Sequence, residues 1–383
     1  MTSVAITGEV FRWARERAGL SDEKLAKSVS TKPEKIRAWE TGREYPNFQQ
    51  AQRLASALSI PLGYLFLSEP PQITNPVADF RTLPGKESAN LSPNLQDVLD
   101  DALRKRDWYK EWRQQEEIAP LEFVGKYSLR SKPESIVHDM RQVLDVPPGF
   151  AEKIGTWELH LRILVQKSES AGILVLQSGI VGNNTRRKLS VQEFRGFALA
   201  DEFASLVFIN AQDSTAARIF TLVHELAHIW TGTSGISNPD FVSDENETQR
   251  TEILCNQVAA EFLVPDEIFI KQWNTHRDPL DNAQQLATRF RVSSQVVLRR
   301  AFDAGFISFN VYRKSIQEAI KASKPRTKGG GGNFYNTLFS RNSRRFTTEL
   351  LSAVSSGRLS YLDGARLLNT RPSKLVSALD KMK

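Results

Sequence analysis

Cysteine and long apolar runs are scarce in this 383-residue sequence, and each scarcity excludes a class of protein. Cys255 is the only cysteine, so no internal disulfide can form, as expected for a protein of a reducing compartment. The longest apolar candidate, GILVLQSGIVG, falls well short of the roughly 20 residues of a membrane-spanning helix. No apolar segment of the secretory-signal type follows the first charges. We therefore expect a cytoplasmic protein without membrane contact.

Acidic residues are scarce at the C-terminal end, where the positive charge is concentrated. Residues 321–383 carry 13 Lys or Arg and three acidic residues, whereas the formal charge of the whole chain is only +7. The rest of the chain is therefore slightly acidic. A tail of this composition either contacts a polyanion or is simply a solvated surface.

Length and periodicity predict the domain organisation. A chain of 383 residues can form two or three domains, and its content of 40% hydrophobic and 25% charged residues is ordinary for a globular protein. The pattern predicts an α+β fold that is mainly helical, interrupted by a proline-rich link and a glycine-rich link. The expected segments are a five-helix domain (1–70), a helical connecting region (71–160), a core with a small β-sheet (161–280), a helical segment (281–320), a basic linker (321–333) and a basic helical tail (334–383).

Short apolar runs predict the sheet of the core. LRILV (161–165), GILVL (172–176) and LVFIN (206–210) are short and rich in β-branched or aromatic residues, which is typical of strands. LVFIN is either an edge strand, to which an extended peptide could add, or an ordinary core strand. A helix is expected at about 245–263.

Three segments share one pattern without gaps: LAKSVSTKPEKI (25–36), LATRFRVSSQVV (286–297) and GARLLNTRPSKL (364–375). Each has a small alanine at its second position, then a polar turn, then a helix with an apolar residue at the twelfth position. Two helices that cross closely leave room only for a small side chain, so the pattern predicts a helix-turn-helix. The helical unit around the first segment supports it, whereas any small helical hairpin can imitate the other two.

Histidine is rare, with five residues in the chain, and two of the five lie in TLVHELAHIWTG (221–232). On a helix, His224 and His228 project from one face a turn apart, so both imidazoles can bind one metal ion. Glu225 is placed beside them to take a proton from an attacking water. The alternative is a buried helix with two structural histidines that bind nothing.

A catalytic zinc ion usually has three protein ligands, so a third should come from a later element. Glu252 shares a helix face with Asn256, which could brace a ligand by a hydrogen bond, whereas Glu261 points roughly the opposite way. We expect Cys255 to be a small buried thiol and not a metal ligand. Glu252 is the preferred ligand, with Glu247 in reserve. The candidates considered are Glu245, Glu247, Glu252, Glu261 and His276.

HELAHIW followed by EILCNQVAAEFLVP resembles the ImmA/IrrE class of zinc-dependent metallopeptidases, whose pattern is His-Glu-x-x-His, then Glu-x-x-(Ala/Cys)-Asn-x-x-Ala-Ala-x-x-Leu-x-Pro. Every position of the pattern is present, and the resemblance covers about residues 160–305. It implies a zincin-like domain in which His224, His228 and Glu252 bind Zn2+ and Glu225 is the general base. It also implies cleavage of a repressor-type protein, which would derepress stress or mobile-element genes.

The N-terminal unit resembles the Xre, or lambda-repressor-like, helix-turn-helix family, whose fusion to an ImmA/IrrE-type peptidase is a familiar bacterial and prophage architecture. A recognition helix at 32–40 would present Lys32, Glu34 and Arg37 to base edges, with Arg43 as a further contact. Residues 1–70 carry ten basic and eight acidic residues, which is a weak basic footprint. The unit therefore binds DNA, binds as a homodimer, or recognises a repressor protein built on the same fold.

Two functions stay open. The first is a cytoplasmic zinc peptidase that cleaves a repressor-type regulator and uses its helix-turn-helix for targeting. The second is a DNA-binding transcription regulator or toxin–antitoxin component whose metal site is structural or sensory. The tail either adds a nucleic-acid contact or anchors the peptidase, through Arg341, Arg344, Arg345 and Arg371.

Overall fold

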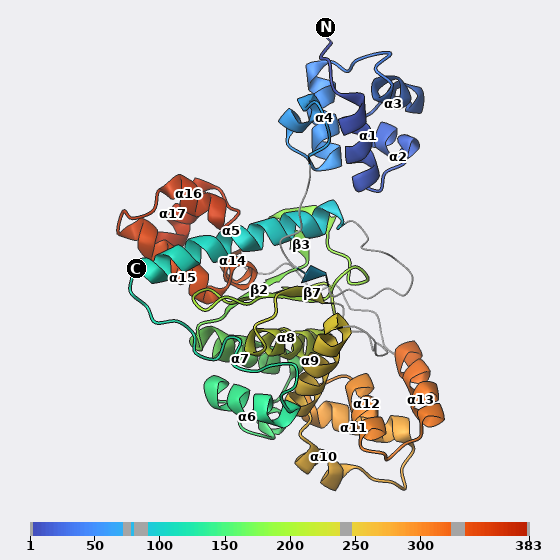
Figure 1. Ribbon diagram of the computed structural model, residues 1–383, viewed down its shortest axis with the longest axis vertical. Coiled ribbons are helices and arrows are strands. Elements are labelled where there is room, and N and C mark those ends of the chain that lie inside the picture. Colours follow the sequence, from blue (N-terminus) through green and yellow to red (C-terminus); the bar gives the residue numbers. More distant parts are fainter. Residues whose placement is uncertain (1–2, 72–77, 80–90, 238–246, 323–333, 381–383) are drawn as a thin grey trace. The chain divides into compact units, whose positions relative to one another are not determined.

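Helices make up most of the computed structural model, which describes residues 3–71, 78–79, 91–237, 247–322 and 334–380 (Figure 1). The expected α+β, mainly helical fold is confirmed. The chain divides into two compact units: the N-terminal unit, Met1–Pro76 with Gly85–Leu99, and the large unit, Val77–Pro84 with Asp100–Lys383. Of the helices in the described ranges, none combines the length of a bilayer with the apolar composition that crossing it requires.

Capping residues and apolar helix faces shape the N-terminal unit. Ser21 caps α2, and Asn47 and Gln50 form a reciprocal capping box at the start of α4. The apolar faces meet around Trp39, which is fully buried. The elements are α1 (Gly8–Arg17), α2 (Asp22–Ser28), α3 (Pro33–Glu40), α4 (Phe48–Leu58) and the 3-10 helix η1 (Leu62–Phe66).

A mixed sheet forms the centre of the large unit. Its strand order is β1-β7-β5-β6-β2, with β2 parallel to β6, β1 parallel to β7, and β5 antiparallel to both of its neighbours. A separate antiparallel hairpin pairs β3 with β4. The strands are β1 (Ala78–Asp79), β2 (Leu174–Ser178), β3 (Ile180–Val181), β4 (Asn184–Lys188), β5 (Gly196–Leu199), β6 (Leu206–Asn210) and β7 (Gly235–Ser237).

The structure corrects one of the expected strands and decides between the two roles left open for another. LRILV (161–165) lies inside α7 (Trp157–Ser170), where Leu161 and Leu164 are buried a turn apart, so a five-residue segment with four apolar residues did not reveal the longer helical period. LVFIN is β6, which is buried along its whole length and pairs with β5 on one side and β2 on the other. It is a core strand, and no peptide can add to its edges.

Helices cover the sheet on both faces. Figure 1 shows α7, α8 (Thr215–Trp230) and α9 (Glu247–Leu263) below the sheet and α5 (Pro93–Gln115) above it. The helix expected at about 245–263 is therefore present. The other helices are α6 (Pro133–Leu144), η2 (Phe150–Lys153), α10 (Asp266–Gln272), α11 (Pro279–Phe290), α12 (Ser294–Asp303), α13 (Phe309–Ala322), α14 (Phe334–Asn342), α15 (Arg344–Ser355), α16 (Tyr361–Leu367) and α17 (Pro372–Asp380).

All three segments with the alanine pattern form two helices joined by one kind of turn. The sixth residue of each has a left-handed backbone, with φ between 50° and 57°. The amide of the seventh residue donates to the carbonyl of the alanine across 2.9–3.1 Å. The alanines and the twelfth residues are buried, as the pattern predicts. The sixth residues are Ser30, Arg291 and Asn369, and the alanines are Ala26, Ala287 and Ala365.

Candidate metal centre

Helix α8 carries the His-Glu-x-x-His pattern in a part of the helix that is buried on all sides. Ser214 caps its start by accepting a hydrogen bond from the Ala217 amide, and residues 221–230 are all buried. At its end, the Trp230 ring stacks on Phe123 with 4.3 Å between centroids and donates a 2.8 Å hydrogen bond to Asp139. These contacts fix both ends of α8, and the helix in turn fixes the positions of its polar side chains.

Three side chains converge in the core between α8 and α9. The Nε2 atoms of His224 and His228 lie 3.2 Å apart. Oε2 of Glu252 lies 3.2 Å from Nε2 of His224, and its Oε1 lies 3.1 Å from Nε2 of His228. None of these side chains is more than 3% exposed. The structure therefore brings the preferred third residue to the two histidines.

The spacing of these atoms fits one small metal ion. Tetrahedral coordination with bonds of about 2.0–2.1 Å places ligand atoms about 3.3 Å from one another. The observed separations of 3.1–3.2 Å are close to that value. Two imidazoles and a carboxylate are a donor set that zinc accepts, and three protein donors leave a fourth position for water or substrate.

Each histidine is also held through its second ring nitrogen. Nδ1 of His224 lies 3.1 Å from Oδ1 of Asn256, and Nδ1 of His228 lies 2.9 Å from the Thr233 hydroxyl. An amide oxygen can only accept, so Nδ1 of His224 carries the proton and the lone pair on its Nε2 faces Glu252. The contact expected of Asn256 is thus present. Thr233 was missed, because nothing in the sequence marks a loop hydroxyl that reaches back to α8.

Burial and charge set the protonation states of the cluster. Burial alone would raise the pKa of Glu252, but the two imidazoles, when they are protonated at Nε2, outweigh it and hold the pKa of this carboxyl well below its usual range. Burial lowers the pKa of His228, against the opposing effect of Glu252. Ionised carboxylate and neutral imidazole are the forms that bind a metal ion. Burial raises the pKa of the Cys255 thiol, which fits a small structural thiol.

Glu225 is buried beside the cluster and lies against strand β5. Gly196 of that strand provides the space: a Cβ atom there would lie 2.9 Å from Oε1 of Glu225 and 2.6 Å from Cγ2 of Thr221. A larger residue at this position would displace the Glu225 carboxylate. Sequence reasoning missed Gly196, because a single glycine at the start of a strand has no distinctive signal.

The other candidate ligands do not join the cluster. Glu261 pairs with Arg300 on the far side of α9, as helix geometry predicted. His276 is exposed in the loop between α10 and α11. Glu245 and the side chain of Glu247 lie outside the described residues.

A pocket opens next to the cluster, between α8, α9 and α12. Phe220 and Asn256 link it to the site: the Phe220 ring lies 6.3 Å from that of His224, and Asn256 holds the same histidine. The walls combine apolar side chains with a few charged ones. The lining residues are Phe220, Ile253, Asn256, Gln257, Ala260, Val296, Arg299, Arg300 and Asp303.

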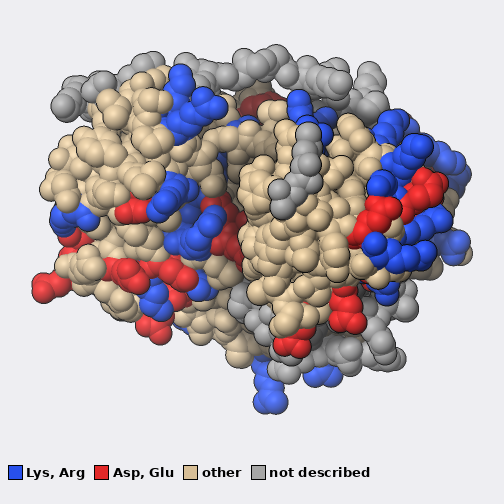
Figure 2. Space-filling model, turned by 90° about the horizontal axis from the view of Figure 1, so that it is seen from above, with Lys and Arg blue, Asp and Glu red and all other residues tan. Residues whose placement is uncertain are grey.

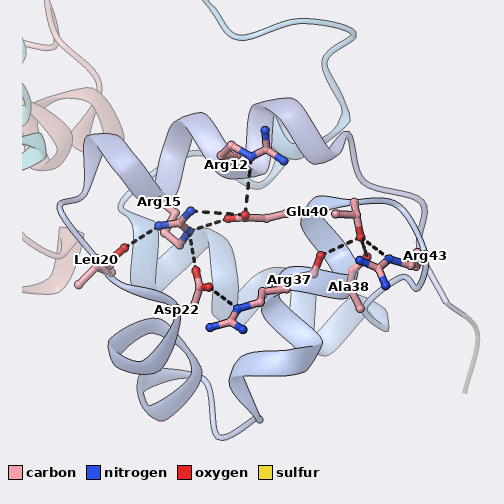
Figure 3. Close-up of polar contacts among 9 residues, drawn as sticks. Arg12, Arg15, Leu20, Asp22, Arg37, Ala38, Glu40 and Arg43 are labelled. Carbon is pink, nitrogen blue, oxygen red and sulfur yellow. Dashed lines mark hydrogen bonds and ion pairs between the residues drawn. The ribbon is translucent and has the colours of Figure 1, made fainter.

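Acidic neighbours compensate much of the basic charge on the N-terminal unit. Nε of Arg37 donates to Asp22 across 2.8 Å, and this hydrogen bond raises the pKa of Arg37 (Figure 3). Arg43 is exposed and donates to Thr41 across 3.1 Å, while Lys32 and Glu34 are exposed on α3. The face shown in Figure 2 likewise has Lys and Arg beside Asp and Glu.

Glu40, the last residue of α3, links α3 to α1 in the same unit. Its Oε1 accepts a 2.5 Å hydrogen bond from Arg15, and its Oε2 lies 3.7 Å from Arg12 (Figure 3). Trp39 is a core residue. The four candidate DNA contacts all lie on the surface: Lys32, Glu34, Arg37 and Arg43.

Three of the four tail arginines anchor the tail to other parts of the large unit. Arg341 donates to Asn183 across 2.6 Å, the backbone amide of Arg344 donates to Glu169, and Arg345 donates to the Tyr109 hydroxyl. Arg371 is different, because it is exposed at the start of α17.

Three family models match separate parts of the chain. Residues 11–65 match a helix-turn-helix model, residues 169–302 match the IrrE N-terminal-like domain, and residues 342–380 match a domain of unknown function (DUF8813). No curated protein gives a significant match to the chain. The second match contains all four residues of the buried His-Glu-His-Glu cluster, and the first contains α2 and α3.

Proposed function

Because the chain joins a helix-turn-helix domain to an IrrE N-terminal-like domain, we propose that it is a zinc-dependent metallopeptidase that controls transcription by cleaving a repressor-type protein. The observation that carries this proposal is the buried cluster of His224, His228 and Glu252 with Glu225 beside it. A helix-turn-helix supplies a route to regulated genes, and the cluster supplies hydrolytic chemistry.

Each residue of the site has one role in the proposal. His224, His228 and Glu252 hold Zn2+, which when bound polarises the scissile carbonyl and acidifies the attacking water. Glu225 takes the proton from that water and returns it to the leaving amine. Asn256 and Thr233 keep the two imidazole rings oriented.

The pocket beside His224 is the proposed subsite for a substrate side chain. Its apolar walls, which include Phe220, Ile253 and Val296, would remove an apolar side chain from water. Arg299 and Asp303 would bind polar groups at the same pocket, either of the substrate backbone or of the next substrate residue.

Glu225→Gln tests the peptidase reading. The zinc-loaded chain is incubated with helix-turn-helix repressor proteins from the same genome, and new termini are identified by mass spectrometry. The variant should bind zinc like the wild type but cleave about 10²- to 10⁴-fold more slowly, because the general base is lost. His224→Gln should lose zinc itself. Cleavage that survives in Glu225→Gln contradicts the proposal.

The competing function is a transcription regulator or toxin–antitoxin component with a structural or sensory metal site. The near-complete burial of all three ligands is the observation in its favour, because closed sites are typical of structural zinc. It predicts that Glu225→Gln leaves both cleavage products and the output of the regulated genes unchanged.

The N-terminal unit would direct the peptidase to DNA or to a repressor protein. Affinity for a duplex from the protein's own promoter region, measured at two salt concentrations, separates these targets. Binding that weakens as salt rises supports DNA contact through phosphates. Binding that is absent at both concentrations leaves the repressor protein as the target.

A further inference from the structure

Helices α16 and α17 reproduce the geometry of the N-terminal helix-turn-helix. Asn369 and Ser30 occupy the same left-handed position in the turn, with φ of 50° and 57°. The hydrogen bond from Thr370 to Ala365 has the same length, 2.9 Å, as that from Thr31 to Ala26. We call α16 and α17 (Tyr361–Asp380) the C-terminal helix-turn-helix.

The second helices of the two motifs also share their register of burial. Leu375 and Ala378 face inward on α17, just as Ile36 and Trp39 do on α3. The first residues match as well, since TRPSKL repeats the pattern of TKPEKI. The outward positions of α17 are Arg371, Ser373, Lys374, Val376 and Ser377, where the N-terminal motif has Lys32, Glu34, Lys35, Arg37 and Ala38.

The middle repeat shows that this geometry alone does not make a binding face. Its second helix, α12, is buried on two sides, and Val296, Val297 and Leu298 all lie in the core. Arg300 of α12 is committed to Glu261 and Asp266. That repeat is a structural part of the large unit, so exposure is what distinguishes α3 and α17.

Charge also favours α17. Its first eight residues with the preceding Arg371 (371–379) contain two basic residues and no acidic one, whereas the matching residues 32–40 contain three basic and two acidic ones. Over the whole C-terminal helix-turn-helix there are three basic and two acidic residues, and one pair of these, Arg366 with Asp363, lies on α16. Val376 adds an apolar side chain, 44% exposed, on the outward face of α17.

We propose that α17 is a second recognition helix that binds duplex DNA. Arg371 and Lys374 would contact phosphates, Ser373 and Ser377 would reach base edges, and Val376 would contact a thymine methyl group. An α-helix fits the major groove of B-form DNA, whereas the major groove of duplex RNA is too narrow for it. This assigns a ligand to residues that match only a domain of unknown function.

The C-terminal helix-turn-helix is also tied to the peptidase core. Asn369 of its turn donates to Asp101 across 2.8 Å, and the Ser343 hydroxyl before α15 donates to the buried Glu169 across 2.6 Å. All of these residues belong to the large unit. DNA bound on α17 would therefore be held at a defined place relative to His224 and His228, independently of the N-terminal unit.

The test uses the full chain and a labelled duplex of about 30 base pairs, with affinity measured by fluorescence anisotropy between 50 and 200 mM salt. Arg371→Glu/Lys374→Glu removes the proposed contacts. Lys32→Glu/Lys35→Glu does the same for α3, so the two motifs are separated. Arg130→Glu/Lys132→Glu makes the same charge change on an exposed loop and serves as the matched control.

We expect the α17 pair to bind at least about tenfold more weakly than the control and the salt slope to fall by about two, because two phosphate contacts are lost. The milder Arg371→Gln/Lys374→Gln variant should show a smaller loss of DNA affinity. If the Arg371→Glu/Lys374→Glu variant does not fold, this milder variant provides the test. Wild-type affinity and slope in both α17 pairs overturn the proposal. An effect confined to duplex RNA, or to the oligomeric state of the chain, also overturns it.

Discussion

At the scale of single residues, the hydrogen bond between Asn256 and His224 would determine how well the proposed site holds zinc. Asn256→Ala leaves the Nδ1 proton of His224 without its acceptor, so the ring is no longer oriented. We expect zinc affinity to fall about 10- to 100-fold, measured by competition with a chelating dye. Asn256→Asp keeps an acceptor and should lose less. Gln257→Ala, on the exposed neighbouring residue, is the control, and equal affinity in Asn256→Ala and this control would refute the role.

Gly196 allows a second prediction at the same scale. The three atoms nearest to a methyl group at this position would belong to Thr221, the Glu225 carboxylate and the Phe208 carbonyl, none of which is a proposed metal ligand. Gly196→Ala should therefore lower kcat about 100-fold while zinc affinity stays unchanged, because a displacement of about 1 Å is enough for such a loss. Gly155→Ala is the matched control, since a Cβ there meets nothing within 4 Å. Full activity in Gly196→Ala would show that Glu225 needs no such space.

At the scale of elements, α7 depends on a neutral histidine. Burial of His160, with a further contribution from the charge of Arg291, lowers its pKa from 6.5 to about 4 against the opposing effect of a backbone hydrogen bond. As pH falls, His160 is protonated in the unfolded chain before it is protonated in the folded chain. The free energy of unfolding is therefore unaffected by the protonation of this histidine above pH 6.5 and decreases progressively between pH 6.5 and 4.

The wild type should consequently lose about 2 kcal/mol of unfolding free energy between pH 7 and pH 5 from this group alone. His160→Gln, which cannot titrate, should lack this part of the decrease. Denaturant unfolding of both proteins at the two pH values measures the difference. Parallel decreases in the two proteins would contradict the assignment.

At the scale of the whole molecule, the chain has two compact units, and the cluster of His224, His228 and Glu252 that is proposed to bind zinc belongs to the large unit. A ligand stabilises only the unit that binds it, by about 2.7 kcal/mol when its concentration is 100 times its Kd. Calorimetry should therefore show two unfolding transitions, of which zinc raises only that of the large unit. His224→Gln should abolish the shift. A zinc-dependent shift of the N-terminal transition would mean that the units unfold together.

Much of the site and fold could be read from local patterns. A spacing of four residues on a helix was enough to put His224 and His228 on one face, and the alanine pattern identified all three helix-turn-helix geometries. The prediction for LRILV was wrong because a five-residue segment with four apolar residues is compatible with a strand and with part of a longer helix. LVFIN was recognised as a strand, but its two partners could not be read from its own residues.

The sequence by itself determined which side chains share a helix face and which turns are tight, because these depend on residues a few positions apart. Only the tertiary structure decided that Thr233 reaches His228, that Gly196 makes room for Glu225, and that α17 is exposed whereas α12 is buried. These outcomes depend on how segments far apart in the chain pack together. A given segment could bury its apolar surface against several partners, and only the free energy of the whole packed chain decides which partner it takes.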